Sequence, residues 1–141
     1  MSDAPHAELA GPATGGFDAH VTFYRVPDLD AASRFYHDLL GLPLTLDQGA
    51  CRIYRVAAGA YLGLCRGEGA ARAESVVITF VTDDVDAWHA RLAAGGATIE
   101  KPPGHNADYG IYHCFVRDPA GHLVEIQRFD DPSWGQPETD R

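Results

Sequence analysis

Glu125 is the residue of this sequence with the clearest capacity for acid–base chemistry. It lies in the strand-like stretch 123–129, where most of its neighbours are apolar. A carboxyl group that is buried without a partner has a raised pKa, and it can then serve as a general acid or base. A structural ion pair with Arg25 is the alternative role for this carboxylate.

The three cysteines are weaker candidates for chemistry. Cys51, Cys65 and Cys114 form no C-x-x-C pair, which argues against a zinc ribbon or a thioredoxin-type motif. An odd number of cysteines in a chain without a secretory leader favours reduced thiols that are buried as small apolar residues. Cys114 follows His113, but neighbours on a strand point to opposite faces, which disfavours a Cys–His nucleophile.

Composition limits the partners that the chain can have. Its 141 residues include 11 Lys and Arg against 20 Asp and Glu, for a formal net charge of −9. This length fits one domain, and no apolar run reaches the ~20 residues that span a bilayer. The N-terminus has no signal-peptide pattern. The acidic excess disfavours nucleic acid and anionic membrane surfaces, so we expect a cytoplasmic protein whose partner is a small molecule.

The elements that must position these residues occur twice along the chain. A strand-like run at 21–26 leads into a helix pattern, in which Asp28 or Asp30 caps the start and Gly41 ends it. The same order returns after 77 − 21 = 56 residues, with a strand at 76–81 and a helix at 84–94.

Short β-like runs follow each helix and complete two βαβββ halves. These runs are 51–56, 60–65, 111–116 and 123–129. One such half leaves a sheet face uncovered, and pairing two halves buries it. We therefore predict an α+β domain over 17–130, with module 1 at 17–66, a linker at 67–74 and module 2 at 75–130, between a mobile N-terminal tail at 1–16 and a C-terminal tail at 131–141.

Two motifs, in this order, resemble the vicinal oxygen chelate superfamily. Residues 28–41 have the form D-L-x-x-(S/A)-x-x-F-Y-x-x-x-L-G, and residues 118–125 have the form D-P-x-G-x-x-x-E. The superfamily includes glyoxalase I, extradiol dioxygenases, and bleomycin- and fosfomycin-resistance proteins. The resemblance implies the glyoxalase/bleomycin resistance fold, in which two tandem βαβββ modules form a cupped mixed β-sheet around a cavity. It also implies a homodimer, but it does not fix a reaction.

The resemblance also implies a place for a divalent metal. Enzymes of that superfamily hold the ion with His, Gln or Glu side chains from four strands. Glu125 matches the last of these positions, but Val21, Gly63 and Val77 occupy the other three. Because these three side chains have no lone pair to give, we predict no metal site and no cofactor. If a divalent transition metal binds, a bulge in the first strand would bring His20 to it beside Glu125.

Alternation along the strands gives the residues that we expect to face the cavity. It also turns His20 and His113 toward the helix layer. A mostly apolar cup with a few converging polar groups is typical of small-molecule sites. The predicted ligand-binding residues are Phe23, Arg25, Tyr61, Thr79, Tyr112, Cys114 and Gln127, with Glu125 as the candidate catalytic residue.

These observations favour a protein that binds a small, partly apolar or aromatic organic molecule in the sheet cavity. Binding would serve sequestration and resistance, or metal-independent acid–base chemistry through Glu125. The alternative is a metal-dependent glyoxalase-like lyase or extradiol-type dioxygenase that uses Glu125 and His20. A pure interaction module is the weakest of the three classes, because nothing in the sequence resembles a peptide-binding groove.

Overall fold

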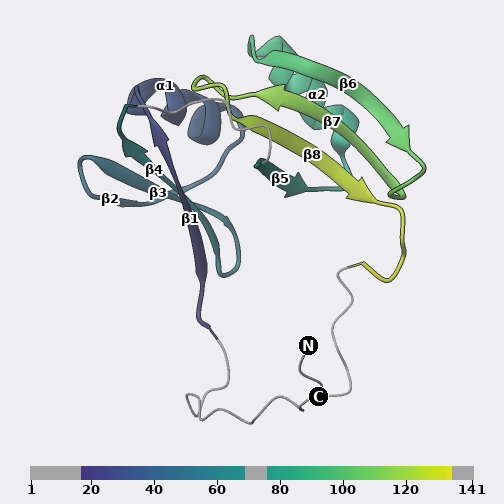
Figure 1. The fold of residues 1–141 in the computed structure, drawn as a ribbon, viewed down its shortest axis with the longest axis horizontal. Helices are drawn as coiled ribbons and strands as arrows, with labels where there is room; N and C mark the ends of the chain where they lie inside the picture. Colours follow the sequence, from purple (N-terminus) through teal and green to yellow (C-terminus); the bar gives the residue numbers. More distant parts are fainter. Residues whose placement is uncertain (1–16, 69–75, 135–141) are drawn as a thin grey trace, which may run out of the picture.

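The computed structural model describes residues 17–68 and 76–134, which form two modules of the same build (Figure 1). The first contains β1 (His20–Val26), α1 (Leu29–Ser33), η1 (Arg34–Leu39), β2 (Leu44–Asp47), β3 (Cys51–Ala57) and β4 (Ala60–Arg66). The second contains β5 (Val77–Val81), α2 (Val85–Ala94), β6 (Thr98–Asn106), β7 (Ile111–Arg117) and β8 (Leu123–Phe129). The predicted tail at 1–16, the linker from residue 69 on and the C-terminal tail from residue 135 on lie outside the described residues.

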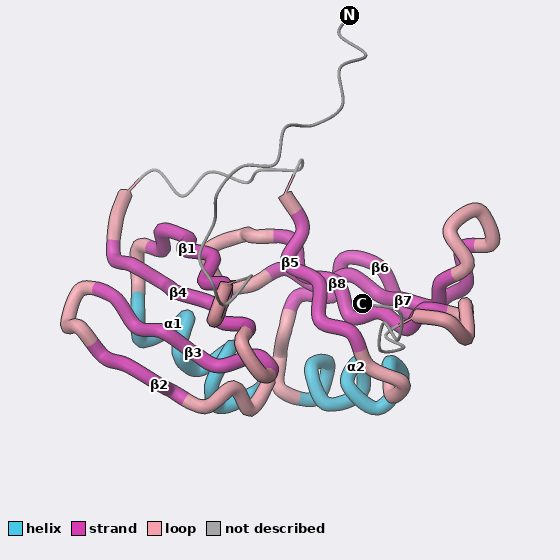
Figure 2. The backbone as a smooth tube through the Cα atoms, turned by 90° about the horizontal axis from the view of Figure 1, so that it is seen from below, coloured by secondary structure: helices cyan, strands magenta, loops and turns pink. Residues whose placement is uncertain are grey.

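Both sheets have the same topology, with strand orders β1-β4-β3-β2 and β5-β8-β7-β6. The first strand of each module runs parallel to the last, and the other neighbours are antiparallel. The helical segments of both modules lie on the same side of the sheets (Figure 2). This repeated order confirms the predicted βαβββ halves and the α+β class.

The helical segments begin where the sequence predicts, but the first is built differently. Asp28 accepts hydrogen bonds from the backbone N–H groups of Asp30 and Ala31, at 3.0 and 3.1 Å, and so caps α1. The predicted single helix then changes into a π-helix, η1, which ends just before Gly41. Gly41 has a φ of 76°, in the left-handed region that suits glycine, and this explains why the helix stops there.

The core lies between each sheet and its helical segment. In the second module, Val124 and Ile126 of β8 are buried against α2, and in the first, Leu62 and Leu64 of β4 are buried against α1 and η1. Successive side chains of a strand point to opposite faces. The residues between these core positions, among them Glu125, therefore belong to the sheet faces turned away from the helices.

A buried hydrogen-bond network joins the two modules through Asp118, which follows β7. The carboxylate of Asp118 accepts a hydrogen bond from the hydroxyl of Tyr36, in η1, at 2.8 Å. It also accepts bonds from the backbone N–H groups of Ala120 and His122, at 2.9 and 2.7 Å, and lies 2.9 Å from Nδ1 of His122. One side chain therefore shapes the β7–β8 turn and anchors the first module to it.

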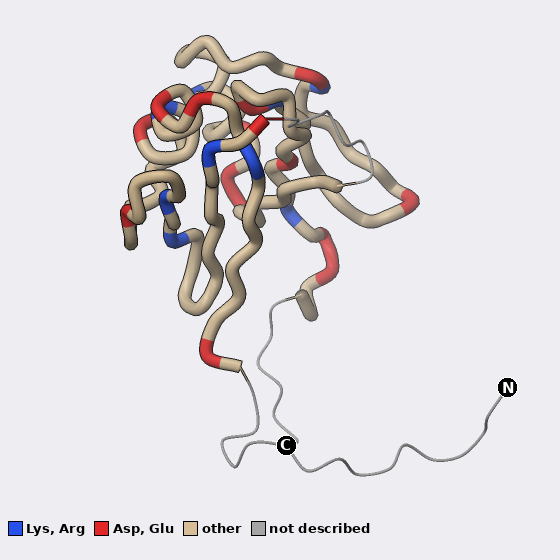
Figure 3. The backbone as a smooth tube through the Cα atoms, turned by 60° about the vertical axis from the view of Figure 1, so that its left-hand side comes forward, with Lys and Arg blue, Asp and Glu red and all other residues tan. Residues whose placement is uncertain are grey.

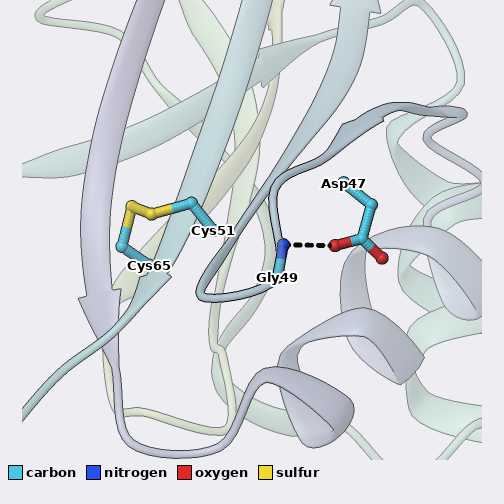
Figure 4. The surroundings of a disulfide bond; sticks show 4 residues. All are labelled: Asp47, Gly49, Cys51 and Cys65. Atoms are coloured by element: carbon cyan, nitrogen blue, oxygen red, sulfur yellow. Dashed lines mark hydrogen bonds between the residues drawn. A yellow bond between two sulfur atoms is a disulfide. The ribbon is translucent and has the colours of Figure 1, made fainter.

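Cys51 and Cys65 are joined by a disulfide, so the expectation of reduced thiols is wrong for this pair (Figure 4). The two residues are direct partners in the antiparallel β3–β4 ladder, with Cα atoms 4.0 Å apart. Sequence spacing does not reveal this contact, because it depends on the register of the hairpin. Cys114 is a free, buried thiol, as predicted.

Charged and apolar residues are not concentrated in a single helix or strand. No helix in the described ranges is long and apolar enough to cross a bilayer. Acidic positions are scattered over many segments, and Lys and Arg positions lie among them (Figure 3). The formal charge of −9 is therefore not concentrated on a single element.

The Asp118 network generates a pH-dependent prediction. Burial alone would raise the pKa of Asp118, but the hydrogen bonds from His122 and Tyr36 outweigh it, and the pKa is lowered. A group whose folded-state pKa is depressed stabilises the fold above its unfolded pKa of about 3.9, and this stability is lost as the pH falls through the folded value. Tyr36→Phe should therefore cost about 2 kcal/mol near neutral pH, because it removes a buried bond to a charged group.

The deficit of Tyr36→Phe should become smaller as the pH falls through the lowered folded-state pKa of Asp118, where the carboxyl group of the folded protein becomes protonated. Urea unfolding of both proteins between pH 7 and pH 3 measures this difference. A deficit that stays constant over the whole range would contradict a charged partner for Tyr36.

Candidate functional site

The register of the second sheet brings four polar side chains to one face. In the β7–β8 ladder, His113 lies opposite Gln127, and Phe115 lies opposite Glu125. In the β5–β8 ladder, Thr79 lies opposite Glu125. Residues directly opposite one another share a face, so Thr79, His113, Glu125 and Gln127 all lie on the face turned away from α2.

Glu125 is the centre of this cluster. Thr79 Oγ1 donates a hydrogen bond to Glu125 Oε1 at 2.9 Å, and His113 Nδ1 lies 2.6 Å from Oε2. The amide of Gln127, oriented with its nitrogen toward the carboxylate, donates to Oε1 and Oε2 at 3.2 and 2.7 Å. An ionised carboxylate is an acceptor only, so these three donor groups match the charged form of Glu125.

His113 lies behind the carboxylate and is almost completely buried. The residue is 3% exposed, and its Nε2 atom has no hydrogen-bond partner among the described residues. If Nδ1–H donates to Glu125, a neutral imidazole leaves only a lone pair on Nε2. A protonated ring would bury an N–H donor without an acceptor, which is costly. The geometry therefore favours a neutral His113 with its proton on Nδ1.

Two adjacent spaces lie between the modules, along β5. The larger has a volume of about 380 Å³ and includes the indole of Trp88 in a mostly apolar lining, and the smaller has about 230 Å³ and is lined in part by Tyr61. Val56, Thr79 and Phe80 line both spaces. We call the two together the β5 cleft. Thr79 belongs to this lining and donates to Glu125, whereas Phe80 and Ile126 of the same lining lie on the helix side of the sheet.

Three of the predicted ligand-binding residues lie at this cleft or in the carboxylate cluster. Tyr61 and Thr79 line the cleft, and Gln127 donates to Glu125. Glu125 itself is on the predicted face, away from the helix. The structure thus brings these four residues into one region.

Phe23 and Arg25 do not line the cleft, although they share the face of the first sheet with Gly63 and Tyr61, as alternation predicts. The Phe23 ring lies over Gly63, close enough that a Cβ at this glycine would collide with it, and the side chain of Arg25 packs over Gly67. Within the part of the chain that the structure describes, no ion pair joins Arg25 to Glu125. The suggested structural ion pair is therefore absent, and the carboxylate finds neutral donors instead.

Tyr112 and Cys114 face the helix layer, which corrects their predicted place beside Glu125. The Tyr112 hydroxyl donates to Asp86 of α2 at 2.6 Å, and this hydrogen bond raises the pKa of Tyr112. Cys114 is fully buried in the core, where burial raises the pKa of its thiol to about 11. Neither side chain can reach the face that carries the carboxylate.

The turn between β7 and β8 explains this error and the missed residue His113. Arg117 pairs with Leu123, so the turn consists of residues 118–122, and counting back from the pair puts His113 on the face of Glu125. Alternation counted from Asp118 alone is shifted by one residue, and such a shift exchanges the two faces of a strand. Knowing the length of this turn would have placed His113 on the correct face of β7.

The residues on this face do not fit the divalent metal that the family resemblance implies. The described residues contain no group of three or more His, Cys, Asp or Glu side chains that could hold one ion. His20 lies on the other face of β1, with its Nε2 3.4 Å from Thr22 Oγ1. The β1–β4 register is regular from His20 to Val26, so the bulge that would turn His20 toward Glu125 is absent from this strand.

The sequence profile of the Glyoxalase/Bleomycin resistance protein/Dioxygenase superfamily matches residues 19–126. This span includes both modules and Glu125, and the chain therefore belongs to that superfamily. Comparison with curated proteins gives no match.

Solved structures with the same fold support this assignment. A lactoylglutathione lyase from Agrobacterium tumefaciens is 29% identical, with a TM-score of 0.64, over 82% of this chain and 94% of that chain. A glyoxalase/bleomycin resistance protein from Albidiferax ferrireducens T118 is 27% identical, with a TM-score of 0.63, over 78% and 96%. TioX from Micromonospora sp. ML1, at 23% identity and a TM-score of 0.67 over 78% and 97%, shares the fold.

The three donors around Glu125 predict that two substitutions of this residue differ strongly in their effect on the free energy of unfolding. Glu125→Ala leaves the side chains of Thr79, His113 and Gln127 without their acceptor, and two of them are buried, so it should cost about 3 kcal/mol of unfolding free energy. Glu125→Gln keeps one acceptor oxygen and the side-chain volume, and it should cost about 1 kcal/mol. Urea unfolding compares the two. Equal costs would mean that the cluster contributes through packing and not through hydrogen bonds.

Proposed function

We propose that this protein binds a small, partly apolar organic molecule in the β5 cleft and exchanges a proton with it through Glu125. One observation carries the proposal: a buried carboxylate, held by three donor groups, is bonded to Thr79, which lines an apolar cleft. No step of the proposal uses a metal, because the cluster offers one carboxylate and one imidazole that are bonded to each other.

The β5 cleft has the properties of a site for such a ligand. Its walls are mainly apolar, with the aromatic side chains of Trp88 and Phe80, and its larger part is of the size that small-molecule sites have. Thr79 and Tyr61 are among the polar groups that could orient a ligand there, and the others in the lining are His20, Thr22, Tyr24 and Thr82. A flat, mostly apolar molecule with one polar end matches this lining.

The arrangement assigns different roles to the two oxygens of Glu125. Oε2 accepts from His113 and Gln127 on the buried side, whereas Oε1 accepts from Thr79, which is exposed, and at 3.2 Å from Gln127. A ligand that displaces the Thr79 hydroxyl would bring its own donor to Oε1, which is the atom that then takes the proton. His113 is a positioning residue in this proposal, because its Nδ1–H fixes the carboxylate and does not touch the ligand.

Sequestration and catalysis differ in one respect at this site. A sequestering protein needs the cleft alone, whereas an enzyme also needs Glu125 to take up and return the proton. The superfamily includes resistance proteins as well as enzymes, so both outcomes are compatible with the fold.

The test uses a panel of aryl ketones, each with an exchangeable C–H next to the carbonyl, in two measurements. A ligand that binds the folded state should raise the melting temperature by mass action. In D₂O, wild-type protein should speed deuterium incorporation at that carbon, and Glu125→Gln should abolish the acceleration while the ligand still binds. Glu100→Gln is the matched control, because Glu100 contacts Arg117 and lies away from the cleft.

The outcomes separate the two parts of the proposal. If no compound in the panel raises the melting temperature, binding of this ligand class is wrong. If compounds bind but wild-type and Glu125→Gln proteins exchange deuterium equally, proton transfer is wrong and sequestration remains.

We also propose that the protein forms a homodimer. β1 and β5 are edge strands with unpaired backbone groups, and Phe23, Val77 and Val81 expose 53%, 38% and 48% of their surface. A second copy is a partner that would cover such edges and apolar side chains. Light scattering at micromolar concentration should give twice the mass of the chain, and the mass of one chain would contradict the proposal.

A further inference from the structure

The disulfide between Cys51 and Cys65 has no part in the proposed function, although it has a chemistry of its own. Both residues lie on the face of the first sheet that carries Gly63, which is turned away from α1 and η1. Each of the two residues is partly exposed. The exchange of a thiol with a disulfide requires such access.

The strand ladder keeps the two cysteines together independently of the bond. Cys51 and Cys65 are direct partners, and the next pairs of the ladder, Arg52 with Leu64 and Ile53 with Gly63, continue the register. Their Cα atoms are 4.0 Å apart. Breaking the S–S bond therefore leaves two thiols side by side, and making it again requires no rearrangement of the backbone.

The turn before Cys51 is also held by hydrogen bonds that do not involve sulfur. The backbone N–H of Gly49 donates to Asp47 Oδ1 at 2.9 Å, as Figure 4 shows. The backbone N–H of Gln48 donates to the carbonyl of Cys51 at 2.8 Å. These bonds hold the end of β3 in place in both redox states.

The third cysteine cannot compete in the exchange. Cys114 is 0% exposed and lies on the helix face of the second sheet, in the other module. Burial raises the pKa of its thiol to about 11, so at neutral pH it is almost entirely protonated. The thiolate is the form that attacks a disulfide, and this restricts exchange to Cys51 and Cys65.

We propose that Cys51 and Cys65 form a reversible thiol–disulfide exchange site for small-molecule thiols. In the first step, a thiolate RS⁻ attacks one sulfur, the S–S bond breaks, and the products are a mixed disulfide and a cysteine thiolate. In the second step, another RS⁻ attacks the mixed disulfide and releases RSSR, which leaves two reduced cysteines. The two electrons come from the two thiols, and RSSR restores the protein disulfide by the reverse route.

The test counts free thiols in the full-length protein. Protein purified without reductant is denatured and alkylated with N-ethylmaleimide, and intact mass should show one adduct, on Cys114. A second sample is first treated in the native state with millimolar 2-mercaptoethanol, then quenched, denatured and alkylated, and it should show three adducts. When the reduced protein is then treated in the native state with bis(2-hydroxyethyl) disulfide, it should again show a single adduct.

Variants assign the adducts and keep the test independent of any one substitution. Cys114→Ala should give no adduct in the oxidised form and two in the reduced form. Cys51→Ser should accept one hydroxyethylthio group on Cys65 from bis(2-hydroxyethyl) disulfide, and Cys65→Ala should accept one on Cys51. Circular dichroism should be the same for oxidised, reduced and variant proteins, because the ladder holds the strands.

Two results would overturn the proposal. Three adducts in protein that was kept without reductant in air would show that the pair does not form a disulfide. A disulfide that resists 2-mercaptoethanol in the native protein, and opens only in denaturant, would show that it is structural and not exchangeable. Neither result depends on ligand binding in the β5 cleft or on Glu125, so this inference and the proposed function fail or stand separately.

Discussion

The hydrogen bonds of Asp118 are the constraint on which the arrangement of this protein depends. Its carboxylate accepts from Ala120 and His122 within the turn, and this fixes the turn at residues 118–122. The turn sets the register of β7 and β8, and the register places Glu125 and His113 on one face. The same carboxylate accepts from Tyr36 of the first module. One buried charge therefore determines both where the carboxylate cluster forms and which surface the other module presents to it.

The environment of Glu125 reflects how a buried charge is stabilised without a counter-ion. Three groups donate to the carboxylate, and none of them carries a formal charge if His113 is neutral. Such a cluster differs from a salt bridge to Lys or Arg, because no guanidinium or ammonium group of the described residues bonds to the carboxylate. The one donor at the exposed side, Thr79, is also the one that a ligand could replace.

The sequence predicted the fold well because its signals were local and repeated. Capping at Asp28, the glycine at position 41 and the D-P-x-G turn each depend on a few neighbouring residues, and the order of strand, helix and glycine returns in the second half. The face of β7 and the Cys51–Cys65 contact depend instead on strand pairing between distant residues, which alternation along one strand does not determine. For this reason Glu125, Thr79, Tyr61 and Gln127 lie on the sheet faces that were predicted, whereas Tyr112, Cys114 and His113 were assigned to the wrong faces.

The two modules have the same architecture but contribute different groups to the β5 cleft. Among the described residues, every side chain that hydrogen-bonds to the Glu125 carboxylate belongs to the second module, whereas the first module contributes part of the cleft lining, including Val56, Ala57 and Tyr61. Changes in that part of the lining alter the shape and polarity of the cleft without removing any bond of the cluster. Evolution or design can therefore change which molecule fits through substitutions in the first module, while the proton-transfer groups of the second module stay unchanged.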